Sequence, residues 1–252
     1  MNHKLNINSN LNTLDNPTMF IRYICEKNDY KIENSQLVAL ESYVTKLLKW
    51  NHAINLISRK DTDKIWTQHI LSSISFLFMF ELRQKSSVLD IGTGGGLPGI
   101  PLSILCPEQR FTLIDSIQKK INAVQDIIED LTLENVSTMC ARAEELSKNK
   151  KFQCKFDYVI ARSVAPAKKL LEWSKPFLIS QKESPLTQES NKTQRKIIPA
   201  GSIILFKGGN PQSEIEEARI RHSPRSIQIF PIAINGIDPT ELFEKKVIII
   251  QP

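Results

Sequence analysis

The sequence has few cysteines and no long apolar run. Its four cysteines, Cys25, Cys106, Cys140 and Cys154, form no Cys-x-x-Cys pair, and the four histidines are too scattered to complete a zinc-binding pattern. No stretch approaches the roughly 18 consecutive apolar residues of a membrane span, and the polar residues 1–16 lack the apolar segment of a signal peptide. We therefore expect a cytoplasmic protein with reduced thiols, no metal site and no membrane partner.

Negative charge is scarce in one part of the chain. The net charge is +6, and residues 141–210 hold 14 Lys or Arg against 6 Asp or Glu, a local charge of +8 that leaves −2 for all other residues. Positive charge gathered in this way is typical of a face that binds a polyanion. A solvated, lysine-rich surface would give the same count, so composition alone leaves both interpretations open.

Hydrophobic periodicity divides the chain into two kinds of segment. Apolar residues recur at helical spacing over residues 35–50, and a second amphipathic pattern runs from Asp61 to about Phe80. After Ser87, short apolar runs alternate with helical patterns. This alternation predicts an α/β fold with a doubly wound, mostly parallel seven-stranded sheet, preceded by N-terminal helices. The predicted strands cover residues 88–91, 111–114, 136–139, 156–160, 202–206, 226–234 and 246–250.

The length of the chain suits one α/β domain with additions better than two independent domains. Residues 1–30 are predicted to be a flexible polar tail, and residues 31–82 a helical extension packed on the core. Residues 83–252 form the main domain, in which the polar stretch near 180–197 lacks periodicity and is predicted to be a mobile insert. We expect the chain to act as a monomer.

A glycine-rich loop follows the first predicted strand of the main domain. From Asp90 to Gly99 the chain reads Asp-Ile-Gly-Thr-Gly-Gly-Gly-Leu-Pro-Gly. Glycines let a cofactor approach the strand end closely, and they leave free N–H groups at a helix start. The segment contains the Asp-x-Gly-x-Gly pattern of enzymes that use S-adenosylmethionine. It also contains Gly94-x-Gly96-x-x-Gly99, which formally meets the dinucleotide fingerprint.

The position of the loop relative to the strand separates these two patterns. In the dinucleotide fold the first glycine follows the strand directly, and here that glycine is Gly92. Counted from Gly92, the sixth position is Leu97, which breaks the dinucleotide pattern. We therefore predict a methyltransferase that uses S-adenosylmethionine as cofactor, and keep a dinucleotide-dependent oxidoreductase as the alternative.

Several further residues are candidates for cofactor binding. Asp90, at the end of the strand, is predicted to receive the amino group of the cofactor through water or a backbone contact. Asp115, at the end of the second strand, is predicted to accept hydrogen bonds from ribose hydroxyls in either fold. Ala143 and Glu144 follow the third strand, where they would border the adenine, although Glu144 could equally cap a helix. The predicted cofactor-binding set is Asp90, Gly92, Thr93, Gly94, Leu97, Asp115, Ala143, Glu144 and Arg162.

The end of the fourth strand bears on the methyl acceptor. It reads Ala161-Arg-Ser-Val-Ala165, without the Asn/Asp-Pro-Pro-aromatic motif that methylation of an exocyclic amine requires. Cys106, the only thiol beside a proline, is interpreted as buried packing and not as a nucleophile. A ring nitrogen such as guanine N7 needs only alignment and desolvation. Arg162 and Lys207 are predicted to position such a substrate through O6 or a phosphate, although either could be an ordinary surface cation.

From about Leu47 to Gly209 the chain resembles the ribosomal RNA small subunit methyltransferase G family, also called glucose-inhibited division protein B. The resemblance rests on the Gly-Leu-Pro-Gly-Ile-Pro-Leu continuation of the glycine loop and on several shorter motifs. These motifs are Trp50-Asn51, Asn55-Leu56, Trp66-x-x-His69-Ile-Leu, Thr112-Leu-Ile-Asp-Ser116, Lys119-Lys120, Arg142-Ala-Glu144, Ala161-Arg162 and Lys207-Gly208.

The resemblance implies a cytoplasmic enzyme that methylates N7 of a guanine in the decoding-centre loop of 16S rRNA, with 16S rRNA or a small ribosomal subunit particle as partner. It implies cofactor contacts from Gly92, Leu97, Ala143, Glu144 and Arg162. The chain departs from the family at Ser72-Ser73, where Asp-Ser is usual, and in its C-terminal quarter. Another RNA, a protein or a small molecule remains open as the acceptor.

Overall fold

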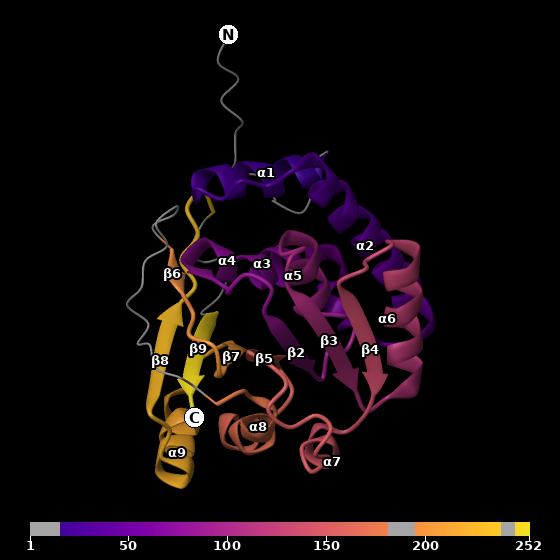
Figure 1. Ribbon diagram of the computed structural model, residues 1–252. Coiled ribbons are helices and arrows are strands. Elements are labelled where there is room, and N and C mark those ends of the chain that lie inside the picture. Colours follow the sequence, from indigo (N-terminus) through magenta and orange to yellow (C-terminus); the bar gives the residue numbers. More distant parts are fainter. Residues whose placement is uncertain (1–15, 181–194, 238–244) are drawn as a thin grey trace.

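The computed structural model describes residues 16–180, 195–237 and 245–252. Its centre is a seven-stranded sheet in the order β4-β3-β2-β5-β7-β9-β8, in which β9 runs opposite to the other six strands (Figure 1). The predicted doubly wound, mostly parallel sheet is confirmed. The strands are β2 (Ser87–Ile91), β3 (Arg110–Asp115), β4 (Val136–Cys140), β5 (Tyr158–Arg162), β7 (Ser202–Lys207), β8 (Ser226–Pro231) and β9 (Lys246–Gln251).

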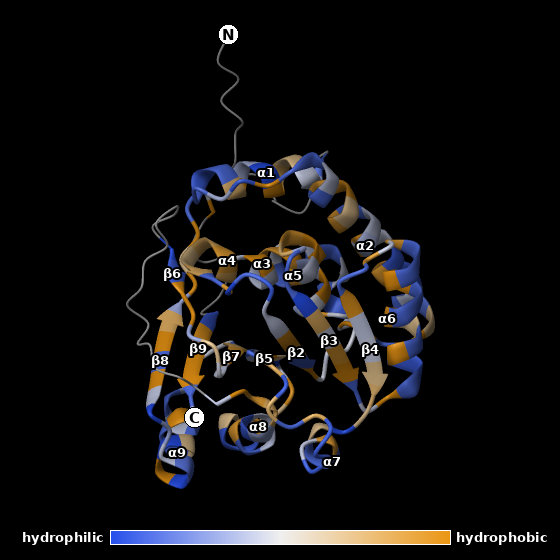
Figure 2. Cartoon of the chain, viewed as in Figure 1, coloured by the Kyte–Doolittle hydropathy of each residue, from blue (hydrophilic) through white to orange (hydrophobic). Residues whose placement is uncertain are grey.

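The central strands are apolar on both faces because helices cover both. In β5, Tyr158 and Ile160 belong to one hydrophobic cluster, whereas Val159 and Ala161 belong to the other. Buried parallel strands typically read as continuous apolar runs for this reason. Figure 2 shows hydrophobic residues along the strands and hydrophilic residues on the outer sides of the helices.

Two helical layers flank the sheet (Figure 1). The buried residues of the helices in each layer share a hydrophobic cluster with one face of the sheet. No helix of the described ranges is long and apolar enough to cross a membrane. One layer contains α2 (Asn34–Ala53), α5 (Gly99–Leu105) and α6 (Gln118–Asp130), and the other α7 (Ala143–Leu146), α8 (Ala167–Ser174) with the turn η4 (Lys175–Phe177), and α9 (Gln212–His222).

The predicted flexible tail over residues 1–30 is wrong for its second half. Pro17–Lys27 form helix α1, which Asn16 caps by accepting a hydrogen bond from the backbone N–H of Met19 at 3.1 Å. Phe20, Ile21 and Ile24 are buried in the same core cluster as the sheet. Their spacing gives one apolar helix face, which burial against the core stabilises. The predictions for residues 1–15 and 181–194 lie outside the described residues.

The second predicted helix, residues 61–80, is not a continuous α-helix. It is divided into η2 (Arg59–Lys64), η3 (Ile65–Leu71), α3 (Ser72–Ile74) and α4 (Phe76–Met79), and η3 is a π-helix. The chain then forms β1 (Phe80–Glu81), which pairs with β6 (Lys196–Ile197), so the end of the predicted mobile insert is a short strand. π-Helical turns are rare and often occur at functional sites, so η3 is a candidate element of such a site.

Candidate cofactor and substrate site

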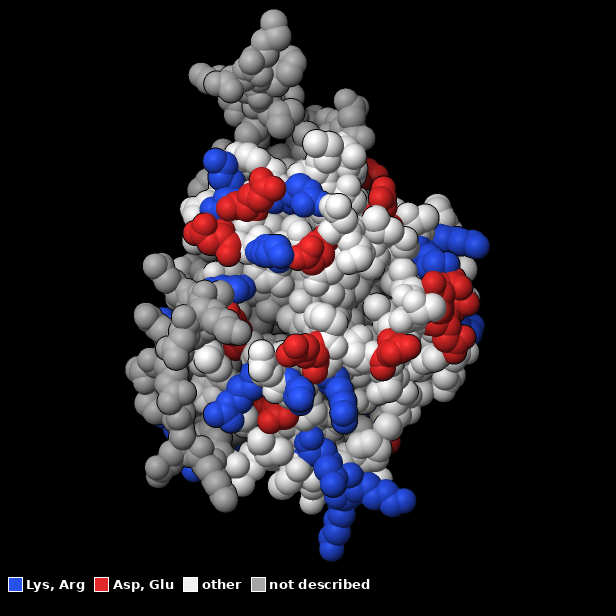
Figure 3. Space-filling model, turned by 45° about the horizontal axis from the view of Figure 1, so that its top comes forward, with Lys and Arg blue, Asp and Glu red and all other residues white. Residues whose placement is uncertain are grey.

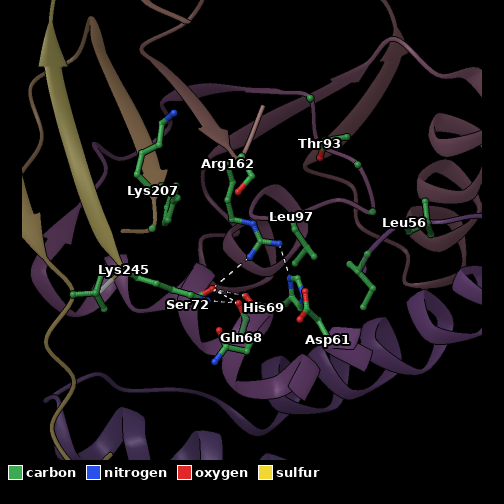
Figure 4. A pocket seen from close by; sticks show the side chains of 18 of the residues that line it. Leu56, Asp61, Gln68, His69, Ser72, Thr93, Leu97, Arg162, Lys207 and Lys245 are labelled. Carbon is green, nitrogen blue, oxygen red and sulfur yellow. Dashed lines mark hydrogen bonds and ion pairs between the residues drawn. The ribbon is translucent and has the colours of Figure 1, made fainter. Parts of the chain in front are cut away.

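A cavity of about 510 Å³ lies at the carboxyl ends of β2, β5 and β7. In open α/β sheets, ligands typically bind outside the carboxyl ends of the strands, and this volume lies within the range of about 300–1,000 Å³ usual for small-molecule sites. The π-helix η3 and the start of β9 close its far side (Figure 4). Six predicted site residues line it: Gly92, Thr93, Gly94, Leu97, Arg162 and Lys207.

The glycine loop forms one wall of the cavity. Gly92 and Gly94 have φ of +67° and +58°, which side chains rarely allow, and a Cβ on Gly92 would lie 2.6 Å from a methyl group of Val164. At Gly94 a Cβ would meet only the carbonyl of Leu56, at 3.6 Å, so the backbone is open to the cavity there. This open stretch of glycine backbone fits a cofactor that must lie directly against the strand ends.

Asp90 binds the loop on the side away from the cavity and does not line the cavity. Its side chain is completely buried, and its Oδ2 accepts hydrogen bonds from the Thr93 hydroxyl at 2.7 Å and the Gly99 N–H at 3.0 Å. Burial raises the pKa of Asp90 to about 7, against the opposing effect of these two hydrogen bonds. The carboxyl group thus faces the loop interior, and its predicted contact with the cofactor's amino group, through water or the backbone, stays a prediction.

Asp115 also binds loop backbone. Its Oδ2 accepts a hydrogen bond from the N–H of Gly94 at 3.0 Å, and its Oδ1 accepts one from the N–H of Ile117 at 3.0 Å. The side chain is nearly buried and does not line the cavity. Its placement at the end of β3 agrees with the sequence, whereas its predicted role toward ribose hydroxyls stays a prediction.

Ala143 and Glu144 lie at the start of α7, one strand farther along the same sheet edge. Ala143 is buried in the second core cluster, and Glu144 is partly exposed, 3.6 Å from Arg142. Neither residue lines the cavity. Their predicted contact with adenine would require the ligand to extend from the cavity along the sheet edge, so it stays a prediction.

Arg162, at the end of β5, projects into the cavity and contacts the π-helix. One Nη atom lies 2.7 Å from Nδ1 of His69, and the other donates a hydrogen bond to the hydroxyl of Ser72 at 3.4 Å (Figure 4). Burial lowers the pKa of Arg162, and the guanidinium nevertheless stays charged. Ser72, where the family resemblance leads one to expect an aspartate, thus lies directly beside Arg162.

Lys207 is tied to other parts of the protein. Its amine lies 2.6 Å from a carboxylate oxygen of Glu214 on α9 and donates a hydrogen bond to the carbonyl of Ala165 at 2.8 Å. In Figure 4 the amine points away from the group around Arg162. The ion pair joins β7 to α9, and the predicted substrate-positioning role of Lys207, which lines the cavity, stays a prediction.

Sequence reasoning missed Lys245 and Asp61. Lys245, just before β9, points into the cavity and donates a hydrogen bond to the carbonyl of Gln68 at 2.6 Å. Burial, together with the charge of Arg162, lowers its pKa to about 8. Asp61 comes from η2 on the opposite side. No local motif marks either residue, because both reach the cavity only through long-range packing.

Comparison with known proteins agrees with this geometry. A family model described as rRNA small subunit methyltransferase G (GidB) matches residues 36–188, more than half of the chain. The ribosomal RNA small subunit methyltransferase G of Pelodictyon phaeoclathratiforme is 35% identical over 242 residues, which cover 94% of each chain. The protein of the same name from Chlorobium limicola is 36% identical and covers 90% of this chain and 94% of its own.

Among solved structures, a predicted O-methyltransferase from Agrobacterium tumefaciens superposes with a TM-score of 0.50 at 12% identity, over 73% of this chain and 80% of its own. At that identity the similarity concerns the fold alone. The family match and the identity across nearly the whole chain go further: the protein belongs to the rRNA small subunit methyltransferase G family.

Proposed function

We propose that the protein transfers a methyl group from S-adenosylmethionine to N7 of a guanine in the decoding-centre loop of 16S rRNA. The observation that carries this proposal is that an open glycine loop and the Arg162 guanidinium line the same cavity. The glycine loop suits the methyl donor, and Arg162 suits an oxygen-rich nucleotide. The family to which the chain belongs supports rRNA as the substrate.

The cofactor supplies an electrophilic methyl group when it is bound, so the protein's task is placement. Gly92, Thr93, Gly94 and Leu97 would hold the cofactor along the strand ends, with their backbone in close approach. Arg162 would hold guanine O6 or a phosphate and leave N7 open. Alignment of this kind, without a strong base, is sufficient for attack by a ring nitrogen that already carries a lone pair.

Surface charge supports a polyanionic partner. In Figure 3, Lys and Arg side chains gather on the lower part of the face shown, with acidic side chains among them. The exposed side chains of Arg142, Lys148, Lys150 and Lys151 follow β4. Lysine and arginine contacts with phosphates make binding strong at low salt and steeply salt-dependent. Such a substrate would place the activity in the cytoplasm, with either 16S rRNA or a small-subunit particle as partner.

Transfer of radioactive methyl groups tests the proposal. The protein is incubated with labelled S-adenosylmethionine and, in parallel, with 16S rRNA, small subunits, transfer RNA, and cell extract freed of RNA. We expect label only in the first two samples, and lower incorporation at high salt. Label confined to transfer RNA or to the RNA-free extract would replace the proposal by a methyltransferase of the same fold with another acceptor.

A further inference from the structure

Arg162 is held by a neutral histidine. Arginine can only donate hydrogen bonds, so Nδ1 of His69, 2.7 Å from the Nη atom, must be the acceptor. The ring is therefore uncharged and carries its proton on Nε2. His69 is thus a fixed acceptor that takes one of the five guanidinium N–H donors.

Asp61 lies on the other side of the ring. Its Oδ2 is 3.6 Å from Nε2 of His69, the nitrogen that carries the proton. This nitrogen is buried and has no hydrogen-bond partner within the described ranges, so Asp61 is the carboxylate toward which it points. A proton on Nε2 is favoured by this carboxylate, and a proton on Nδ1 is disfavoured by Arg162. Both neighbours select the same tautomer.

The backbone that carries His69 is held by separate contacts. In the π-helix η3, the carbonyl of His69 accepts a hydrogen bond from the Ser73 hydroxyl at 2.7 Å. The carbonyl of Gln68 accepts one from the Ser72 hydroxyl at 2.7 Å and one from Lys245 at 2.6 Å. Three side chains thus donate hydrogen bonds to carbonyl groups of the π-helical turn. These contacts fix the backbone of the turn and, with it, the position of the His69 ring.

Within the described ranges Arg162 forms no ion pair, although the carboxyl groups of Asp90 and Asp61 lie near enough to favour its charge. Burial and the neighbouring cations Arg162 and Lys245 lower the pKa of His69 to about 3, so the ring stays neutral at physiological pH. Among the described residues, Arg162 makes its side-chain hydrogen bonds with this neutral ring and with the hydroxyl of Ser72. Its positive charge is thus available to a ligand in the cavity.

We propose that His69 is a positioning residue for Arg162, and that Asp61 fixes the tautomer of its ring, so that the guanidinium is aimed at a negatively charged or carbonyl oxygen of a molecule bound in the cavity. For the reaction itself, this inference rests on the proposed function. The oxygen belongs either to the carboxylate of the cofactor or to the nucleotide, which supplies O6 or a phosphate.

Two substitutions of His69 separate positioning from packing. In His69→Asn, the side-chain oxygen can take the place of Nδ1 and accept from Arg162. In His69→Gln, a larger side chain carries its polar end near the place of Nε2 and leaves Arg162 without that acceptor. We expect His69→Gln to lower kcat/KM for methylation of 16S rRNA by about 10- to 100-fold, and His69→Asn to retain most of it. His52→Asn, exposed at the end of α2, is the matched control.

The binding of S-adenosylhomocysteine, measured by calorimetry, identifies the source of the oxygen. If the Kd rises from the wild-type protein through His69→Asn to His69→Gln, as kcat/KM falls, Arg162 holds the cofactor carboxylate. If Kd stays constant while kcat/KM falls, Arg162 holds the nucleotide. Equal losses in His69→Asn and His69→Gln, with unchanged melting temperatures, would overturn the positioning role.

Nitrogen NMR of the histidine rings tests the inference without any substrate. In the wild-type protein we expect the His69 signal, identified by its loss in His69→Asn, to remain that of a neutral ring protonated on Nε2 down to about pH 5.5. Protonation of the ring between about pH 6 and 7, or a proton on Nδ1, would overturn the inference whatever the activity. Failure of the wild-type protein to methylate rRNA would instead refute the proposed function, and the NMR result would still decide the role of His69.

Discussion

The amine of Lys207 lies 2.6 Å from the carboxylate of Glu214 and so joins the end of β7 to the first turn of α9. Glu214 also accepts a hydrogen bond from the N–H of Ala167, at the start of α8. One carboxylate thus holds the ends of three elements, of which β7 lines the cavity. This contact indicates that Lys207 contributes to local stability, beside its predicted role in substrate positioning.

A double-mutant cycle with Lys207→Met and Glu214→Gln tests this role. Because both side chains are largely buried, we expect a coupling of about 0.5–3 kcal/mol in the free energy of unfolding, measured in urea. Methylation by Lys207→Met should fall far less than methylation by Arg162→Lys. Additive effects on stability, combined with a large loss of activity in Lys207→Met, would instead support the predicted role in substrate positioning.

Arg162→Lys keeps the positive charge and replaces the planar guanidinium group by an amine. A lysine amine cannot reproduce the geometry in which one guanidinium contacts both His69 and Ser72, so the charge is expected to be misplaced. We expect kcat/KM to fall by about 100-fold with little change in melting temperature. Activity within a few-fold of the wild-type value would show that Arg162 supplies only charge.

Gly92→Ala tests the glycine loop. The new Cβ would lie 2.6 Å from Val164 in a residue with φ of +67°, so we expect a loss of about 1–3 kcal/mol in stability and much weaker binding of S-adenosylhomocysteine. Gly208→Ala is the control for stability, because a Cβ there meets nothing within 4 Å. Equal stability of the two variants would contradict the account of the loop.

Asp90 gives the folded protein a characteristic dependence on pH. Its pKa in the folded state, about 7, lies above the ordinary value of 3.8, so the folded state holds the proton more strongly than the unfolded state. The resulting stabilisation is complete below pH 3.8 and is lost as the pH rises through 7. Between about pH 5.5 and 8, the wild-type protein should lose roughly 1–2 kcal/mol relative to Asp90→Asn, measured by urea unfolding. If the free energy of unfolding changes with pH by the same amount in both proteins, the raised pKa of Asp90 is contradicted.

Cofactor choice can be tested by calorimetry with S-adenosylhomocysteine and NAD. Gly92, not Gly94, follows directly after β2, and the backbone at Gly94 is open to the cavity. We expect binding of S-adenosylhomocysteine alone. Binding of NAD alone would return the chain to the oxidoreductase alternative.

The sequence predicted what is local and missed what depends on long-range packing. The strand, the glycine loop and Arg162 form short motifs whose placement at the sheet edge follows from the α/β alternation. Asp61, His69 and Lys245 reach the same cavity from η2, η3 and the residue before β9, and no spacing in the sequence links them. The burial of Asp90 and the ion pair of Lys207 likewise depend on neighbours that only the folded chain brings together.

The most direct test of the account maps the methylated nucleotide itself. Ribosomal RNA from cells with and without the gene is treated with borohydride and aniline, which cleave the chain at 7-methylguanine, and is then read by primer extension. We expect one cleavage at a guanine of the decoding-centre loop of 16S rRNA that is lost with the gene and restored by the wild-type chain, but not by Gly92→Ala. A cleavage pattern that is unchanged at every guanine would contradict it.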